Sequence, residues 1–230
     1  MQNSHRGNEP RRLYQQIADQ IRMLIQNGQF VAGSRLPAER DLAQQLGVSR
    51  PSLREALIAL EIDGSVEIRM GSGIYACATT DRPASLIRSM GESPSELMQA
   101  RLAIEGAVVV LACARITPEG LAALRAELQA MQSDVAEGRS PLEHDRQFHL
   151  EIAAQAGNSV LTRIVADLFD ERQGLILSQL SIKFDNPETW ATALSEHEII
   201  FRALASADPL MAQAAMRFHL QASKERWVGE

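Results

Sequence analysis

The sequence has few cysteines, few aromatic residues and no long apolar run, and each shortage excludes a class of protein. The two cysteines, Cys77 and Cys113, lie far apart, which excludes a disulfide framework and a cysteine-based zinc site. Aromatic residues make up only 4% of the chain, which disfavours a sandwich of aromatic-rich strands. No apolar stretch approaches the roughly 20 residues of a membrane-spanning helix, and the polar N-terminus lacks the apolar core of a secretory signal. We therefore expect a cytoplasmic protein.

The chain of 230 residues, 45% apolar and 23% charged, is typical of a soluble globular protein with one large or two ordinary domains. Its net charge of -6 is unevenly distributed. Residues 1–80 contain nine arginines, no lysine and eight acidic residues, whereas residues 81–230 contain 14 basic and 21 acidic residues. This asymmetry indicates two domains with different partners.

The N-terminal part has the periodicity of three helices followed by a hairpin. The apolar spacing and the alternation predict these elements over residues 13–27, 38–46, 50–63 and 66–77. Gly47 gives a tight turn between the second and third helices, and Ser49 is a good N-cap for the third. After a polar tail over residues 1–12, residues 13–78 are therefore expected to form a helix-turn-helix with a β-hairpin.

The second helix of such a motif places its N-terminus in the major groove of DNA. Two arginines lie one turn apart at that end, and arginine forks suit guanine edges and phosphates. Two serines there can donate to phosphate, and a further arginine flanks the bare glycine turn of the hairpin. These candidates are Ser49, Arg50, Ser52, Arg54, Arg69 and Gly71. The local helical pattern alone is equally typical of a simple helical hairpin with a solvated charged face.

The run LPAERDLAQQLGVSRPSLREALIALEIDGSVEIRMGSGIYA resembles the winged helix-turn-helix of the GntR family of bacterial transcription regulators. The resemblance implies that Gly71 at the wing tip approaches the minor groove. It also implies that three arginines contact DNA, namely Arg40, Arg50 and Arg54. The sequence departs from the family at Met70, where relatives often have a basic residue or histidine, and at Pro51, where they often have a small residue.

The sequence pattern predicts helices for the remainder of the chain. Residues 79–93 are expected to be a linker that carries a short helix over residues 86–90. A proline follows a Ser, Thr, Asn or Asp at five helix starts, where it loses no hydrogen bond: Pro94, Pro118, Pro141, Pro187 and Pro209. We predict helices over 94–115, 118–137, 141–155, 159–180, 187–206 and 209–227. The expected fold class is mainly α, with an N-terminal winged helix-turn-helix and, over residues 94–230, an all-α bundle of six or more helices.

Three of these helices each carry one histidine in an apolar stripe, and the first carries an aspartate one turn earlier. The residues are Asp145, His149, His197 and His219. Buried imidazoles and carboxylates need partners, and one divalent metal ion would satisfy all four. The donors favour zinc, with nickel and manganese as alternatives. Any one of these histidines alone would more often be a core residue that bonds a backbone carbonyl.

Five short motifs resemble the C-terminal ligand-binding domain, the FCD domain, of the FadR subfamily: residues 100–105, 145–149, 157–158, 196–198 and 216–220. The resemblance implies that the same Asp and three His residues are the metal ligands. It implies that Arg101 holds an effector carboxylate and that Asn158 lines the pocket. The plainer interpretations are an intrahelical Arg101–Glu105 pair and a helix cap at Asn158. The acyl-CoA-binding branch lacks the metal set, so an acyl-CoA effector is disfavoured.

Together these features predict a homodimeric transcription factor that binds an inverted repeat in double-stranded DNA, and not a membrane. We expect a repressor that a small carboxylate releases from DNA. Residues 60–69 and the spacing from Trp190 to His197 resemble regulators of hexuronate catabolism, which favours a sugar acid, with lactate, citrate and other organic acids as open alternatives. Two alternatives are a metal-sensing regulator without an organic effector and a metal-dependent hydrolase or lyase with a DNA-binding appendage. No further acid or base of clear spacing accompanies the cluster, so we do not expect an enzyme.

Overall fold

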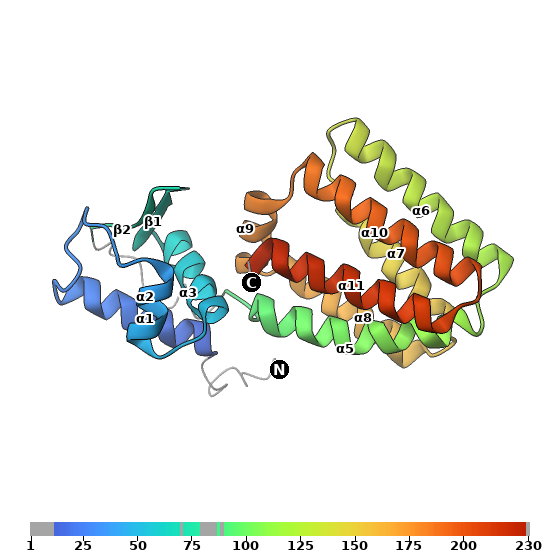
Figure 1. Cartoon of the computed structure of the whole chain (residues 1–230), viewed down its shortest axis with the longest axis horizontal. Coiled ribbons are helices and arrows are strands. Elements are labelled where there is room, and N and C mark those ends of the chain that lie inside the picture. The colour runs from blue at the N-terminus through green and yellow to red at the C-terminus, as the bar shows by residue number, and fades with distance from the viewer. Residues whose placement is uncertain (1–11, 70, 79–86, 88–89, 229–230) are drawn as a thin grey trace, which may run out of the picture. The chain divides into compact units, whose positions relative to one another are not determined.

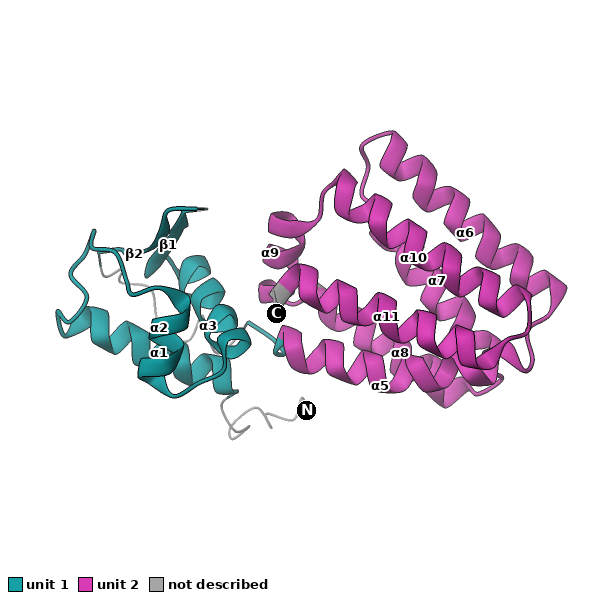
Figure 2. Ribbon diagram, in the orientation of Figure 1, with its two compact units in different colours: residues 1–93, 230 teal, residues 94–229 magenta. Residues whose placement is uncertain are grey.

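The computed structural model describes residues 12–69, 71–78, 87 and 90–228, and the chain divides into two compact units between Ser93 and Pro94 (Figure 2). Most of the predicted N-terminal tail, Met70 and most of the predicted linker with its short helix lie outside the described residues. Among the described residues, no helix is long and apolar enough to cross a membrane.

Over residues 12–69 and 71–78, the first unit has three helices and a two-stranded antiparallel sheet (Figure 1). They are α1 (Leu13–Gln26), α2 (Glu39–Leu46), α3 (Arg50–Asp63), β1 (Val66–Arg69) and β2 (Gly73–Ala76). In the sheet Val66 lies opposite Ala76, and Arg69 lies opposite Gly73. The core is made by the apolar stripes of the helices, including Ile17, Ile21, Leu42, Leu53, Leu57 and Leu60. This is the predicted helix-turn-helix with a small wing.

The turn between α2 and α3 follows from two residues. Gly47 has a φ of +68°, a left-handed conformation that favours glycine and ends α2. Ser49 then caps α3, because its side-chain oxygen accepts a hydrogen bond from the backbone N–H of Ser52 at 3.2 Å. The cap fixes the N-terminal end of α3, which carries most of the predicted DNA contacts.

The segment before α2 pairs with β2 through an isolated bridge, which the sequence pattern did not predict. Leu36 donates its backbone N–H to Ile74 at 2.8 Å, and Ala76 donates to Ser34 at 2.9 Å. Between these bonds Arg35 forms an isolated bridge with Tyr75. The segment contains glycine and proline and is too short to show alternation, so its sequence gives no sign of this pairing.

The second unit is entirely helical in its described part (Figure 1). Its elements are α5 (Pro94–Cys113), α6 (Pro118–Ala136), α7 (Leu142–Gln155), α8 (Ser159–Asp170), the 3-10 helix η1 (Glu171–Gln173), α9 (Leu175–Phe184), α10 (Pro187–Ala205) and α11 (Pro209–Val228). As predicted, Thr117, Asn186 and Asp208 accept hydrogen bonds from backbone N–H groups at the starts of α6, α10 and α11. Ser140 does not cap α7, which begins at Leu142 after Pro141.

The prediction of one helix over residues 159–180 was wrong. The chain leaves α8 at Asp170, passes through η1 and starts α9 at Leu175. Gly174 has an extended backbone, with φ -57° and ψ +148°, which interrupts the helix. The apolar spacing continues on both sides of this glycine, so the periodicity did not reveal the break. The described bundle therefore has seven α-helices instead of six.

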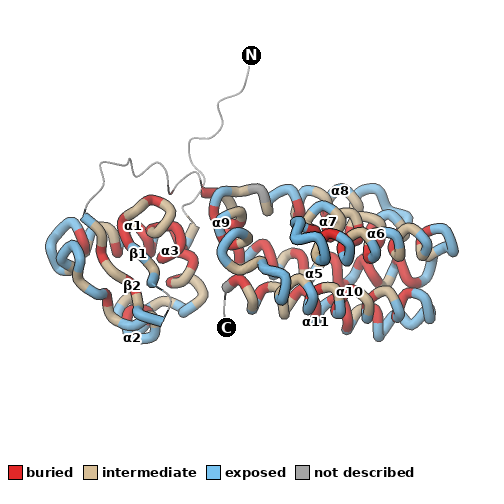
Figure 3. The backbone as a smooth tube through the Cα atoms, turned by 90° about the horizontal axis from the view of Figure 1, so that it is seen from above, coloured by how far each residue is buried: buried red, intermediate tan, exposed pale blue. Residues whose placement is uncertain are grey.

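Helix α11 packs along α5 and α10, and α7 packs against α5, α6 and α8. Figure 3 shows buried residues along the inward faces of these helices and exposed residues on their outer faces. Most of the bundle core is apolar and includes Phe148, Ile152, Val165, Phe169, Ile200 and Leu220. Within it lies a group of buried polar side chains, which the next section describes.

Candidate functional site

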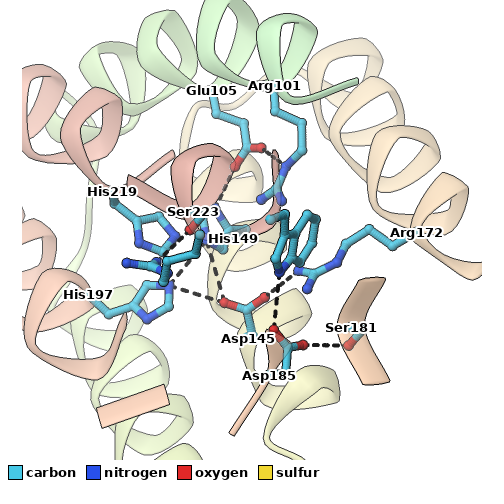
Figure 4. Close-up of polar contacts among 12 residues, drawn as sticks. Arg101, Glu105, Asp145, His149, Arg172, Ser181, Asp185, His197, His219 and Ser223 are labelled. Carbon is cyan, nitrogen blue, oxygen red and sulfur yellow. Dashed lines mark hydrogen bonds and ion pairs between the residues drawn. The ribbon is translucent and has the colours of Figure 1, made fainter. Parts of the chain in front are cut away.

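The four predicted metal ligands come together inside the second unit (Figure 4). Asp145 and His149 come from α7, His197 from α10 and His219 from α11, and all four are buried. Each offers one ligand atom, and these atoms all lie within 4.8 Å of one another. His197 Nε2 lies 3.2 Å from Asp145 Oδ1 and 3.3 Å from His149 Nε2. Helices far apart in the sequence thus form one site.

Two carboxylates orient the histidines from behind. Glu105 on α5 lies 2.5 Å from His149 Nδ1, and Glu196 on α10 lies 2.8 Å from His219 Nδ1. Arginines hold both carboxylates in turn: Arg101 donates to Glu105 at 2.7 Å, and Arg226 donates to both oxygens of Glu196 at 2.7 and 3.0 Å. Hydrogen bonds from ligand histidines to carboxylates are a common feature of metal sites, where they fix the tautomer and raise the basicity of the ring.

The charges on these two carboxylates determine where the imidazole protons lie. Burial alone would raise the pKa of Glu105, but Arg101 and His149 lower it to about 2. The pKa of Glu196 is also lowered to about 2, because hydrogen bonds from His219 and Arg226 outweigh its burial. Ionised carboxylates only accept hydrogen bonds, so His149 and His219 carry their protons on Nδ1. Their Nε2 atoms therefore keep free lone pairs.

His149 and His219 are neutral at neutral pH. Burial lowers the pKa of His149, and burial together with His197 lowers that of His219 to about 3. The pKa of Asp145 is held well below its ordinary value, since the hydrogen bond with His197 and the charge of Arg172 outweigh its burial. Arg172 donates to Asp145 Oδ2 at 2.9 Å, which leaves Oδ1 toward the histidines. The site thus presents lone pairs and one negative oxygen.

These residues fit a divalent metal ion. Nitrogen lone pairs and a carboxylate oxygen that converge on one point need a shared proton, as in the His197–Asp145 hydrogen bond, or a cation between them. Two ligands of a tetrahedral zinc ion lie about 3.4 Å apart, close to the separations of 3.2 and 3.3 Å found here. His197 Nδ1 is buried without a hydrogen-bond partner in the described part of the chain, so this ring depends on its Nε2 side for a polar partner. Neutral imidazoles and a carboxylate suit zinc, nickel and manganese.

A small cavity of about 30 Å³ adjoins the cluster. Three arginines, Arg101, Arg172 and Arg226, line it together with Asp145 and His219. A volume of this size holds about two water molecules. The arginines are each paired with one carboxylate, but Arg101 Nη2 is buried without a hydrogen-bond partner among the described residues.

The two predicted effector residues differ in position. Arg101 is 2% exposed and lies in the cavity wall, where its guanidinium stacks over the Phe169 ring at 3.9 Å. Its expected pair with Glu105 is also present. Asn158 is exposed and caps α8, accepting hydrogen bonds from Val160 and Leu161, and it is not among the residues that line the cavity. The structure thus gives Asn158 the capping role that the sequence offered as its plainer interpretation.

Sequence reasoning missed the residues that surround the cluster. Glu196 and Arg226 were not singled out, and Arg172 was not considered, although all three contact ligand residues or their partners. Glu196 directly precedes His197, and this adjacency was the available signal. Arg172 lies in η1, within the missed helix break, so the predicted continuous helix gave no indication of where its side chain points.

The predicted DNA contacts at the start of α3 and in α2 lie on the surface of the first unit. Arg40 and Arg50 are exposed and have no ion pair with any carboxylate that the structure describes. Arg54 instead pairs with Glu39 on α2 at 2.8 Å. The Ser49 and Ser52 hydroxyl groups lie 2.8 Å apart and form a hydrogen bond, so the helix cap already uses part of their hydrogen-bonding capacity.

The other two predicted DNA contacts, Arg69 and Gly71, lie in the wing. Arg69 pairs with Glu67 at 2.8 Å and lies over the Tyr75 ring at 4.4 Å. Gly71 has a φ of +71° and open space where a side chain would be, so a groove wall can approach its backbone closely. Arg35 crosses the wing at Gly73, where a Cβ would lie 2.5 Å from its Nε atom. The sequence analysis did not single out Arg35.

Comparison with known proteins identifies both units. Residues 13–76 match the family described as "Bacterial regulatory proteins, gntR family", and residues 96–222 match the FCD domain. The chain belongs to the GntR family. Within it, this FCD-containing regulator is 34% identical to the Exu regulon transcriptional regulator of Escherichia coli strain K12, over 94% of this chain and 84% of the relative.

The regulator is also 36% identical to the Uxu operon transcriptional regulator of the same strain, over 94% of this chain and 86% of the relative. Among solved structures, E. coli McbR/YncC is similar with a TM-score of 0.52 and 22% identity, covering 93% of this chain and 96% of that chain. That likeness supports the fold. The family membership makes the protein a DNA-binding transcriptional regulator and not an enzyme.

Proposed function

We propose that this regulator is a homodimeric repressor. A small carboxylate, a sugar acid, binds at a metal ion in the FCD domain and lowers the affinity of the repressor for its operator. The observation that carries the proposal is the buried Asp145, His149, His197 and His219 cluster beside a cavity lined by three arginines. Metal and arginine together are a strong site for an organic anion.

The DNA-binding half of the proposal rests on the first unit. Arg40 and Arg50 lack carboxylate partners among the described residues, and are available to phosphates and guanine edges. Arg54 can leave its ion pair with Glu39 and contact DNA instead. The hydroxyl groups of Ser49 and Ser52 are placed to donate hydrogen bonds to a phosphate. Arg69 and Gly71 are the candidate contacts in the wing. A two-fold dimer of such units matches an inverted repeat, so footprinting should protect both half-sites. Protection of a single half-site would contradict the dimer.

The sensing half rests on the second unit. The four ligand residues would hold the metal, which when bound supplies positive charge and open coordination positions for an effector carboxylate. Arg101 offers its Nη2 group to the same carboxylate. The similarity to the Exu and Uxu regulators favours a hexuronate or a related sugar acid.

Regulation requires that the effector distinguish two states of the bundle. Ligand pockets usually measure roughly 300 Å³ or more, so a cavity of about 30 Å³ must enlarge before a sugar acid enters. An effector that binds only the enlarged state shifts the population toward that state. We propose that this rearrangement lowers the affinity of the paired DNA-binding units for the operator.

A thermal-shift screen of zinc-loaded protein tests the proposal. Hexuronates, aldonates and aldarates are compared with lactate and citrate. We expect one sugar-acid class to raise the melting temperature, since a ligand at a hundredfold excess over Kd adds about 2.7 kcal/mol of stability. The shift should disappear after chelation and in Arg101→Ala. Turnover of any acid would support the hydrolase or lyase alternative.

Metal sensing without an organic effector is the second candidate, and the small volume of the cavity favours it. In that case no acid shifts the melting temperature, while chelation both lowers stability and changes operator affinity. Titration of operator binding with zinc alone, in buffers free of carboxylates, separates the two candidates.

A further inference from the structure

The cavity wall that faces the arginines is built for hydroxyl groups. Asp185, Thr189 and Trp190 come from the junction of α9 and α10, and Ser223 and Trp227 come from α11. Carboxylate and hydroxyl oxygens accept hydrogen bonds from alcohols, and indole faces pack against the C–H groups of a carbon chain or ring. The chain has only two tryptophans, and both line this cavity. A plain carboxylate would leave this wall unused.

Asp185 is the charged member of this wall, and at present protein groups occupy its two oxygens. Trp227 donates its indole N–H to Asp185 Oδ1 at 3.1 Å, and Ser181 donates its hydroxyl to Oδ2 (Figure 4). Trp227 in turn stacks on Arg172, whose guanidinium lies 4.6 Å from the ring centre and pairs with the ligand Asp145. A connected series of contacts therefore joins the end of α9 to the metal cluster.

Helix α9 has open space on two further sides. A cavity of about 390 Å³ lies between its Leu177, Ser178, Ser181 and Ile182 side chains and those of α7, with Arg172 in its wall. A second cavity, of about 310 Å³, adjoins Ser181, Ile182, Asp185 and Trp190. Ile182 is 74% exposed although it lines both cavities. The C-terminal half of α9 is thus the loosely packed part of the bundle beside the metal cluster, and its outward shift would enlarge the small cavity.

We propose that Asp185 is the residue that selects polyhydroxy acids. When α9 moves outward, hydroxyl groups of the effector replace the Trp227 N–H as donors to Asp185, while the effector carboxylate lies at the metal and arginine wall. This inference rests on the proposed function and adds to it the residue that accepts hydrogen bonds from the hydroxyl groups of the effector. It also assigns α9 as the element that admits the effector.

Intrinsic tryptophan fluorescence tests the proposal, because both reporters line the cavity. Zinc-loaded full-length protein is titrated with a hexuronate and with hexanoate, a six-carbon monoacid without hydroxyl groups. We expect wild type to prefer the hexuronate at least tenfold and Asp185→Ala to abolish that preference, with hexanoate affinity changed less than twofold. A hydrogen bond to a charged group is strong enough for a change of this size.

Trp227→Phe is the matched control, since it removes the competing N–H but keeps Asp185 and an aromatic ring. It should bind the hexuronate as tightly as wild type or more tightly, with Trp190 as the reporter. If Asp185→Ala does not fold, Asp185→Asn replaces it, with the same expected loss of preference. Equal weakening of both ligands, or an unchanged preference, would overturn the role of Asp185. Absence of any response of wild type to either acid, in fluorescence and in melting temperature, would instead overturn the proposed function and this inference with it.

Discussion

At the scale of single residues, the metal cluster owes its character to charges placed behind the ligands. Glu105 and Glu196 hold the protons of His149 and His219 on Nδ1, so that the opposite nitrogens are free. The four residues of the cluster could be predicted from sequence because each histidine falls in an apolar helical stripe and Asp145 lies one turn before His149. The residues behind them could not, because they come from other helices whose packing the local pattern does not specify.

Glu105→Gln should weaken zinc binding by about 10- to 100-fold, the usual range for loss of a carboxylate behind a ligand histidine. The amide presents a donor as well as an acceptor and no longer fixes the tautomer of His149. Competition with a chromophoric chelator measures the affinity. Glu127→Gln is the matched control, because Glu127 also lies 2.8 Å from a histidine, His144, outside the cluster. Equal effects of the two changes would refute the role of Glu105.

The lowered histidine pKa values make the metal-free protein sensitive to acid. Below the ordinary pKa of 6.5 the unfolded chain binds protons at these rings, whereas folded His219 stays neutral down to about pH 3. The free energy of unfolding should therefore fall as the pH falls below 6.5. Stability from Glu105 and Glu196 is lost further down, between about pH 4.5 and 2.

Urea unfolding in the presence of a chelator, between pH 8 and pH 5, measures this dependence. His219→Asn should reduce its slope, because the variant removes one group whose protonation differs between the two states. A steeper or equal slope in His219→Asn would contradict the assignment.

At the scale of elements, the sequence predicts the start of a helix best where a capping residue directly precedes an apolar helical stripe. The starts of α3, α6, α10 and α11 were predicted for this reason. The break between α8 and α9 was not, since Gly174 leaves the apolar spacing intact, and neither was the strand pairing of Arg35, which depends on contact with β2. Both of these unpredicted features lie beside functional residues, where tertiary contacts outweigh local preference.

Helix α3 should contribute to DNA affinity mainly through its N-terminal arginine. Arg50→Ala removes a cation that has no carboxylate partner in the described part of the molecule, so we expect roughly a tenfold weaker operator complex. If Arg50 contacts a phosphate, the slope of log affinity against log salt should also fall by about 1. Fluorescence anisotropy over a range of salt concentrations measures both. Arg163→Ala, an exposed arginine on α8, should change neither.

At the scale of the whole molecule, the GntR match and the FCD match fall on two separate compact units. The division could be predicted from the charge asymmetry and from the change of periodicity after the hairpin. We expect the full-length regulator to sediment as a dimer of its 25.3 kDa chain at the concentrations used for operator binding. A monomer that still protects both half-sites would contradict the proposed two-fold arrangement.

The arginine–carboxylate pairs around the cluster determine how binding of the metal ion and binding of the effector affect each other. Asp145, Glu105 and Glu196 carry three negative charges, and Arg172, Arg101 and Arg226 carry three positive ones, so this group is neutral when the imidazoles are neutral. A divalent ion would add two buried positive charges, which an anionic effector would offset. Thermodynamic linkage makes this coupling reciprocal: the effector should tighten zinc binding by the same factor by which zinc tightens effector binding. Calorimetric titrations in both orders would give that factor, and a factor of one would contradict this offset of charge.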